Sequence, residues 1–149
     1  MTFPRLRDRI PLNMKRNEIE FEGTVLKTKD LLGPFDEIVF AYLHGSFVRG
    51  EAFRDVDVAV FLRPGTPLSS DDVEYEISLS LRLEKACGLP ADVKILNRAP
   101  LSFRYHASRG ILLLSRDESA REDFLNRTWS EYFDFARLAR IYQEELTRA

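Results

Sequence analysis

Four short apolar runs are the feature of this sequence that most constrains its fold. Each is rich in β-branched or aromatic residues and has a glycine or proline close to one end, which is typical of buried strands. The segments between them have helical spacing and end at breakers such as Gly33-Pro34 and Gly88. The predicted strands span residues 37–45, 55–62, 91–96 and 111–115.

The remaining segments predict helices, of which the one within residues 99–110 is short. They span Thr24–Leu32, a stretch from Ser69–Asp72 to Cys87, part of residues 99–110, and Glu118 to nearly the end. The second helix takes its N-cap from Ser69–Asp72, and Ile77, Leu81 and Ala86 are expected to face inward. Alternating strands and helices predict an α/β or α+β fold, a mixed sheet of about four strands flanked by helices with a long C-terminal helix.

The N-terminal residues carry prolines and several basic side chains, so residues 1–16 predict an irregular or strand-like arm. We therefore divide the chain into an arm, residues 1–20, and one domain, residues 21–149. A chain of 149 residues is long enough for one domain with a real core.

Composition excludes several classes of protein. No apolar run approaches the ~20 residues of a membrane span, and the basic N-terminus lacks the apolar segment of a secretory signal. We therefore expect a cytoplasmic protein that does not bind membranes. The single cysteine, Cys87, excludes an internal disulfide and the usual cysteine-based metal sites. The formal net charge of −2 argues against strong nucleic-acid binding.

Two aspartates open the second predicted strand. Asp55 and Asp57 are separated by one residue, so they should share a face, roughly 6.5 Å apart, while Val56, Val58 and Val60 point into the core. Two ionised carboxylates held this close repel each other unless a cation lies between them. Such oxygen ligands suit Mg²⁺, which completes its shell with water and phosphate oxygens.

A glycine-serine pair ends the first predicted strand. Gly45 allows close approach to a ligand, and the Ser46 hydroxyl with neighbouring backbone N–H groups can hold a phosphate. Gly50 adds a flexible point, and Arg49 and Arg54 add positive charge, although both can equally be ordinary surface arginines. Together with the aspartates, this loop predicts a phosphoryl- or nucleotidyl-transfer site.

A third carboxylate begins the third predicted strand. Asp92 can join Asp55 and Asp57 around the metal if the two strands are neighbours. Lys94 lies two residues farther on the same face, and an ion pair with it is the alternative role for Asp92. His44 is expected to be a strand-end residue rather than a base, and His106 a structural or exposed one.

These motifs resemble the minimal nucleotidyltransferases, small members of the DNA polymerase beta-like superfamily. Their signature is Gly-Ser, a glycine-containing spacer, then Asp-x-Asp before an apolar strand, here Gly45-Ser46, Gly50 and Asp55-Val56-Asp57. The similarity continues through a third-carboxylate strand with Asp92 and covers most of the chain from Thr24. The spacer of eight residues is about two shorter than is common in the family, and Ile95 replaces a frequent second aspartate.

The resemblance implies a nucleotidyltransferase fold and an antitoxin that transfers AMP from ATP to a tyrosine of a HEPN-domain ribonuclease toxin. By position, Gly45 and Ser46 would bind the triphosphate, with Arg49 and Gly50 in the same loop. Asp55, Asp57 and Asp92 would be the catalytic and Mg²⁺-binding residues. The alternatives are an inactive antitoxin that neutralises its toxin by contact, and transfer to another acceptor such as a small molecule.

Aromatic and aliphatic residues lie on more than one side of the last predicted helix. A helix with so wide an apolar arc is usually buried on two sides. One side can pack on the sheet, and the other can bind a partner or a second copy, or the helix can wrap against its own domain. The residues expected to face inward or toward a partner are Phe124, Leu125, Trp129, Tyr132, Phe133, Ala136, Ala139 and Ile141.

Overall fold

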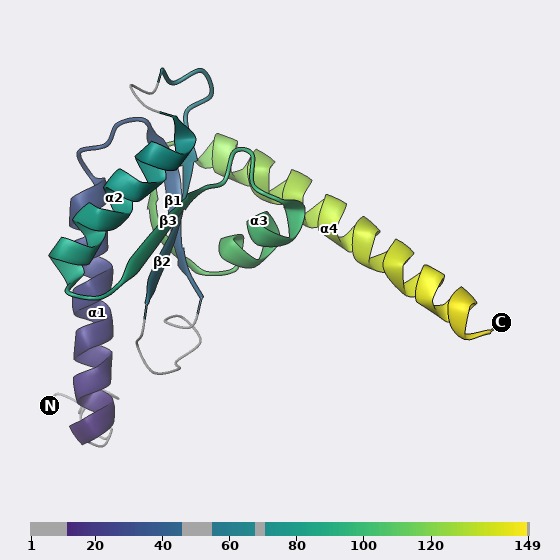
Figure 1. Cartoon of the computed structure of the whole chain (residues 1–149), viewed down its shortest axis with the longest axis horizontal. Coiled ribbons are helices and arrows are strands. Elements are labelled where there is room, and N and C mark those ends of the chain that lie inside the picture. The colour runs from purple at the N-terminus through teal and green to yellow at the C-terminus, as the bar shows by residue number, and fades with distance from the viewer. Residues whose placement is uncertain (1–11, 46–54, 68–70, 149) are drawn as a thin grey trace, which may run out of the picture.

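The computed structural model describes residues 12–45, 55–67 and 71–148, with side chains from residue 18 onward. Within these ranges the chain alternates helices with single strands or strand pairs (Figure 1). The elements are α1 (Leu12–Leu32), β1 (Ile38–His44), β2 (Val56–Leu62), α2 (Asp72–Cys87), β3 (Ala91–Ile95), α3 (Leu101–Ser108), β4 (Ile111–Ser115) and α4 (Glu118–Thr147). The predicted α/β class and the long C-terminal helix are confirmed.

The four strands form one mixed sheet in the order β3-β2-β1-β4. β1 is antiparallel to both β2 and β4, whereas β2 and β3 are parallel. β2 and β3 are therefore neighbours, as the placement of Asp92 beside the Asp-x-Asp motif requires. The parallel register aligns Asp57 with Asp92 and Val58 with Val93.

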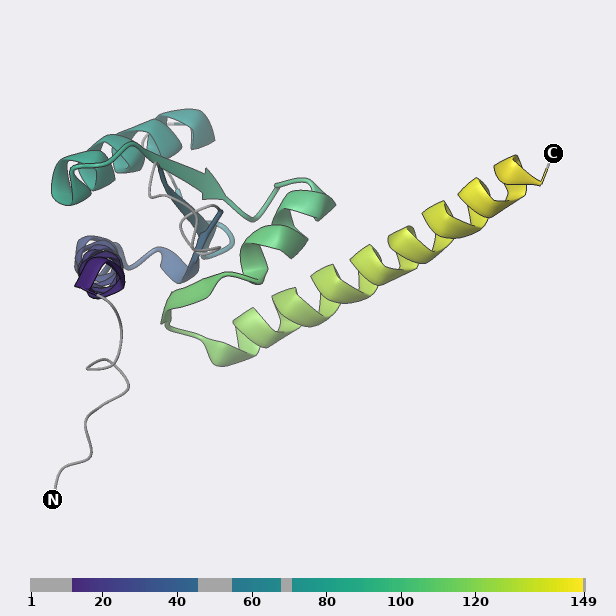
Figure 2. The same ribbon diagram turned by 90° about the horizontal axis from the view of Figure 1, so that it is seen from below.

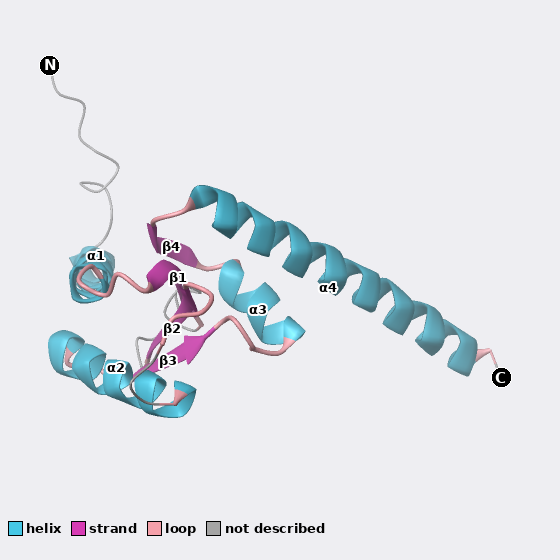
Figure 3. Ribbon diagram, turned by 90° about the horizontal axis from the view of Figure 1, so that it is seen from above, coloured by secondary structure: helices cyan, strands magenta, loops and turns pink. Residues whose placement is uncertain are grey.

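Helices cover both faces of the sheet. α1 and α2 lie on one face, and α3 with the first part of α4 lies on the other (Figure 3). Val56, Val58 and Val60 are fully buried in the core between the sheet and the first pair of helices, which confirms the predicted inward face of β2. Ala59 and Phe61 alternate with them and pack in a second core on the opposite face.

The first helix is longer than its sequence predicts. α1 begins at Leu12 rather than Thr24, so the prediction of an irregular or strand-like segment is wrong for residues 12–16. Residues 1–11 lie outside the described residues. α1 stays in place through tertiary packing: Thr24, Thr28 and Leu32 are buried at i, i+4 and i+8. Of these, Leu32 packs in the core beneath the sheet.

The caps of α2 follow the predicted chemistry. The Asp71 carboxylate accepts a hydrogen bond from the Glu74 amide at 2.8 Å, and Gly88 ends the helix at φ 70°, a left-handed conformation. The predicted inner face is wrong, however, because Ile77 and Leu81 are 55% and 60% exposed and Ala86 is also exposed. The buried residues are Leu79 and Leu83.

Side chains of α2 explain this orientation because they hold the helix against the edge strand β3. Ser80 Oγ accepts a hydrogen bond from the Val93 amide at 2.9 Å, and Glu84 Oε1 accepts one from the Ala91 amide at 3.2 Å. These contacts turn the stripe containing Ile77 and Leu81 toward solvent. They also occupy two amide donors of an edge strand that could otherwise pair with another chain.

The final helix leaves the domain. The first turns of α4 pack on the sheet through Phe124 and Leu125, and the later turns project beyond the other elements (Figure 2). Phe135, Leu138 and Tyr142 are 63%, 66% and 64% exposed, so the helix does not wrap against its own domain there. Among the described residues, no helix is both long and apolar enough to cross a bilayer.

Candidate functional site

The candidate site is formed where β1 ends and β2 begins. Gly45 directly follows β1 with φ 84°, a conformation that favours glycine, and a Cβ added there would overlap Oδ2 of Asp57. The Asp57 carboxylate therefore lies against the backbone of the residue that opens the Gly-Ser motif. Sequence reasoning predicted that Gly45 lets a ligand come close to the backbone; the structure shows the Asp57 carboxylate close to Gly45, and the approach of a ligand stays a prediction.

Asp57 has a carboxylate partner on the neighbouring strand. It is aligned with Asp92 in the parallel register of β2 and β3, and aligned residues project their side chains on the same face of a sheet. Adjacent strands lie ~4.8 Å apart, so the register places two acidic side chains side by side. The arrangement that sequence reasoning required of Asp57 and Asp92 is present.

His44 extends this row to a third strand. It is the last residue of β1 and is aligned with Asp57 in the antiparallel register. Burial lowers the pKa of His44 to about 4, although the negative charge of Asp92 acts in the opposite direction. The imidazole is therefore neutral at neutral pH, and its ring packs edge-on against Phe103 of α3, with centroids 5.3 Å apart.

Lys94 makes the ion pair that was the alternative role for Asp92. Its Nζ lies 3.9 Å from Asp92 Oδ1 and 3.5 Å from Glu76 Oε2 of α2. Burial raises the pKa of Glu76, and the charge of Lys94 partly opposes that rise. Asp92 remains exposed, with 57% of its side-chain surface accessible, so the ion pair does not close it to a ligand.

The other predicted site residues divide into two groups. Asp55 is exposed and directly precedes β2, one residue outside the regular strand. Ser46, Arg49, Gly50 and Arg54 lie outside the described residues, so their roles stay predictions. Among the residues that the structure does describe, no three His, Cys, Asp or Glu side chains form a group that could hold a metal ion.

The donor chemistry nevertheless fits Mg²⁺. Asp57 and Asp92 supply oxygen ligands from adjacent strands, and Asp55 supplies a third at the start of β2. Mg²⁺ commonly uses one or two carboxylates and takes its other ligands from water and phosphates, so a closed cage of three protein side chains is not required. The backbone at Gly45 lies against one of these carboxylates, that of Asp57, at the motif predicted to bind phosphate.

Sequence reasoning missed Glu76, and it placed His44 correctly at a strand end without foreseeing that His44 is aligned with Asp57. Glu76 reaches the site only because α2 packs along β3, and no local pattern signals that contact. For His44 a signal existed, since it immediately precedes Gly45 and has the same strand parity as Tyr42, a residue of the core on that face.

A small hollow of about 210 Å³ also opens beside Asp92, between α2 and the edge of β3.

Comparison with known proteins bears on the family and the fold. The sequence profile of the family described as "Polymerase beta, Nucleotidyltransferase" matches residues 26–119, which include all four strands. Among curated proteins, none matches the chain.

Several solved structures have the same fold. A chain of the toxin-antitoxin complex MntA-HepT is 19% identical with a TM-score of 0.61, over 83% of this chain and 97% of its own. A chain of a toxin-antitoxin structure with AMP-PNP is 21% identical, with a TM-score of 0.65. The match covers 83% of this chain and 98% of that one. A chain of a complex of tri-AMPylated HEPN toxin and MNT antitoxin from Shewanella oneidensis is 17% identical, with a TM-score of 0.59. The match covers 88% of this chain and 98% of that one.

Proposed function

Because this chain belongs to the polymerase beta nucleotidyltransferase family, we propose that it is a Mg²⁺-dependent nucleotidyltransferase of the antitoxin type. It transfers AMP from ATP to a tyrosine of a HEPN-type ribonuclease toxin and so neutralises that toxin. We expect it to act in the cytoplasm, where ATP is available. The observation that carries the proposal is the alignment of Asp57 with Asp92 beside Gly45.

The acidic residues share a metal-binding task in this reaction. Asp55, Asp57 and Asp92 would hold Mg²⁺, which supplies positive charge to the triphosphate and to the departing pyrophosphate. The backbone around Gly45 and Ser46 would hold the terminal phosphates. Most of the rate acceleration would come from positioning and charge stabilisation, as is usual in phosphoryl transfer.

Activation of the acceptor needs a base. The phenolic oxygen attacks the α-phosphorus and forms a new O–P bond as the bond to pyrophosphate breaks. A tyrosine hydroxyl has an ordinary pKa near 10, so its proton must be removed during attack. Asp92 is an exposed carboxylate beside a small hollow and can accept this proton. Neutral, buried His44 is less suited to that task.

The later turns of α4 offer a surface for the partner. Phe135, Leu138, Tyr142 and Leu146 recur at i, i+3, i+7 and i+11 and form a single stripe, here called the outer α4 stripe. Their exposed fractions run from 59% to 66%, and a contiguous exposed apolar surface of this kind is typical of interaction sites. This stripe fits a complex with another protein, and solved structures of similar fold are toxin-antitoxin complexes.

A binding-only antitoxin is the second candidate, and the ion pair between Lys94 and Asp92 favours it. A lysine that permanently neutralises Asp92 would weaken metal binding and proton acceptance. In that case the chain would inhibit the toxin through contact along α4, without transferring a nucleotide.

Transfer of label from α-labelled ATP to the purified toxin partner separates the two candidates. The active enzyme should label a toxin tyrosine when Mg²⁺ is present, and replacing both Asp55 and Asp57 with Asn should abolish labelling. Circular dichroism and toxin binding of the double variant should stay as in the wild type. Toxin inhibition without any labelling by the wild type would instead establish the binding-only antitoxin.

A further inference from the structure

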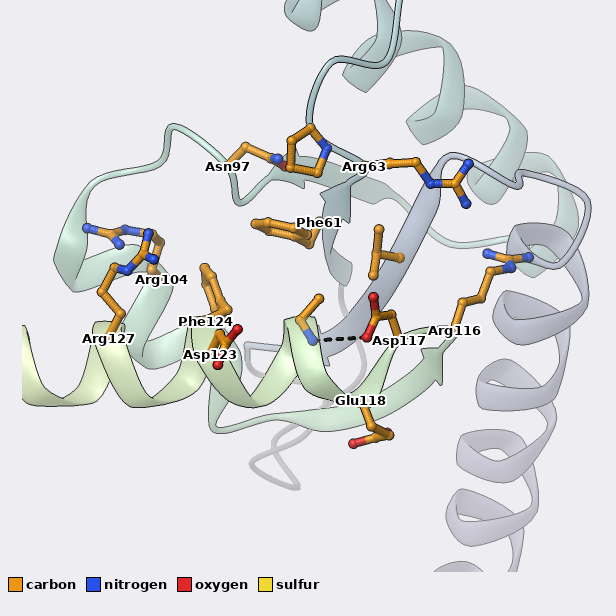
Figure 4. A pocket seen from close by; sticks show the side chains of 13 residues that line it. Phe61, Arg63, Asn97, Arg104, Arg116, Asp117, Glu118, Asp123, Phe124 and Arg127 are labelled. Atoms are coloured by element: carbon orange, nitrogen blue, oxygen red, sulfur yellow. Dashed lines mark hydrogen bonds between the residues drawn. The ribbon is translucent and has the colours of Figure 1, made fainter.

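A large cavity lies away from the carboxylates. It has a volume of about 920 Å³ and is lined by Val39 at the start of β1, Phe61 and Arg63 at the end of β2, and parts of α3 and α4 (Figure 4). Arg63 directly follows β2 and is six residues from Asp57, a span of ~20 Å in an extended chain. The cavity and the candidate catalytic site therefore occupy opposite ends of the same strand.

Two arginines from different helices converge on one side of this cavity. Arg104 of α3 and Arg127 of α4 point toward each other (Figure 4). Arg104 donates from Nε to the Ala99 carbonyl at 3.1 Å, and its Nη2 lies 3.5 Å from Glu131. Arg127 has no hydrogen bond or salt bridge within the described part of the chain. Two guanidinium groups repel each other, and an anion bound between them removes that cost.

Aromatic rings form the inner wall of the cavity. Phe61 and Phe124 are half-buried, with ring centroids 5.5 Å apart, and both line the cavity. The two rings are inclined at 58° to each other, so a planar ring can stack on the exposed part of one while its edge contacts the other. Asn97 is fixed nearby, because its amide side chain accepts from the Leu62 N–H at 2.9 Å and donates to the Leu62 carbonyl at 2.8 Å.

An acidic side chain in the cavity wall limits which kinds of ligand can bind there. Asp123 also lines the cavity and lies beside Phe124 (Figure 4). Its carboxylate would repel a bare phosphate but would accept hydrogen bonds from hydroxyl groups. A ligand that carries a phosphate, hydroxyl groups and a planar ring satisfies the arginines, Asp123 and the phenylalanines together. The cavity volume is within the range of small-molecule sites.

We propose that this arginine-lined cavity binds a nucleoside phosphate at a second site, separate from the site of AMP transfer. The phosphate lies between Arg104 and Arg127, the ribose hydroxyls face Asp123, and the base lies against Phe61 and Phe124. Both a free nucleotide and the phosphorylated end of an RNA strand carry this chemistry.

Calorimetric titration of the full chain with AMP in EDTA tests the proposal. The titrations use an Asp57→Asn background to suppress the catalytic site. We expect saturable binding that weakens at least tenfold in Arg127→Glu and is unchanged in Arg140→Glu. Arg140 is the matched control because it is an exposed arginine of the same helix that does not line the cavity. Arg127→Ala should weaken binding as well, without adding a new negative charge.

Other probes identify which groups of the ligand the cavity recognises. Adenosine and inorganic phosphate should each bind at least tenfold more weakly than AMP. A 5′-phosphorylated oligoadenylate that binds more tightly than AMP would identify RNA as the source of the ligand, and equal or weaker binding would identify free nucleotide. The proposal fails if AMP does not bind, if Arg127→Glu and Arg140→Glu behave alike, or if a phosphotyrosine peptide binds in place of AMP.

These outcomes are independent of the proposed transfer reaction. Loss of AMP transfer in Asp57→Asn, together with unchanged AMP binding in EDTA, supports both proposals. Absence of transfer by the wild type, with Arg127-dependent binding retained, rejects only the proposed function.

Discussion

Gly45 connects the backbone conformation of the site to its chemistry. Its positive φ and the close approach of Asp57 both require the absence of a Cβ. A substitution at this position therefore changes two things, the backbone energy and the position of the carboxylate. A second glycine of the chain allows these effects to be separated.

Gly45→Ala should reduce AMP transfer roughly 100-fold, the scale of loss that follows misplacement of a catalytic group by about 1 Å. Gly65→Ala is the matched control, because Gly65 has a similar φ of 80° but nothing within 4 Å of an added Cβ. Left-handed backbone strain should cost both variants ~1–2 kcal/mol of unfolding free energy. Urea unfolding and steady-state transfer rates measure the two effects, and equal transfer rates in the two variants would contradict the role given to Gly45.

Individual site residues were predictable where the motif is local. Asp57 and Gly45 follow from strand alternation and from the glycine that ends a strand, whereas Asp92 depended on β2 and β3 being neighbours, and the structure brings the three together. The contacts of Lys94 depended on tertiary packing, since its distance to Glu76 is set by how α2 sits on β3. The sequence identifies Lys94 as an ion-pair partner of Asp92, but it does not show that Glu76 is a second partner of Lys94.

At the scale of elements, α2 joins the edge strand to the core. Tyr75 donates a hydrogen bond to Glu37 Oε1 at 3.0 Å, linking α2 to the residue just before β1. Burial, followed by the Glu37 interaction, raises the pKa of Tyr75 above its ordinary value of 10.0. The folded state therefore holds this proton more tightly than the unfolded state does.

This difference predicts a loss of stability at alkaline pH. The contribution of Tyr75 is fully present below pH 10, its ordinary pKa, and decreases as the pH rises above 10, where the unfolded state loses the proton first. Tyr75→Phe should cost about 1–2 kcal/mol at pH 8 and should reduce the loss above pH 10. Urea unfolding from pH 8 to 11 measures this. Tyr142→Phe is the control, and an identical alkaline slope for Tyr75→Phe and wild type would refute the account.

The sequence predicted the element boundaries well where the capping residues are local. It predicted the wrong buried face for α2. β4 spans Ile111–Ser115 as predicted, and α2 ends at Gly88. In α2, however, two apolar stripes exist, one through Leu79 and Leu83 and another through Ile77 and Leu81. Periodicity detects both stripes, but only the packing of α2 against β3 decides which one is buried.

At the scale of the whole molecule, the chain has a compact α/β body and a helix that extends from it (Figures 1 and 2). Phe124 and Thr128 anchor the base of α4, whereas the outer α4 stripe contacts no core cluster. Exposed apolar area of this kind favours association. The wide apolar arc predicted burial on two sides, and the chain alone supplies only one.

Truncating the outer α4 stripe should affect assembly and leave folding intact. The triple variant Phe135→Ala, Leu138→Ala and Tyr142→Ala should keep its unfolding free energy within ~0.5 kcal/mol, since exposed positions contribute little. Its affinity for the toxin partner should fall at least tenfold, as measured by calorimetry. Leu26→Ala, which removes a 59% exposed leucine on α1, should bind normally. Unchanged toxin affinity in the triple variant would place the interface elsewhere.

We propose that Asp57 and Asp92, on adjacent strands, form the centre of AMP transfer to a partner protein. Intact-mass measurement of the toxin, purified from cells that also produce this chain, tests it most directly. With the wild type, the toxin mass should increase by one or more AMP units, located on a tyrosine by peptide sequencing. With Asp57→Asn the toxin should still copurify but should carry no AMP, whereas a toxin modified equally by Asp57→Asn would contradict the account.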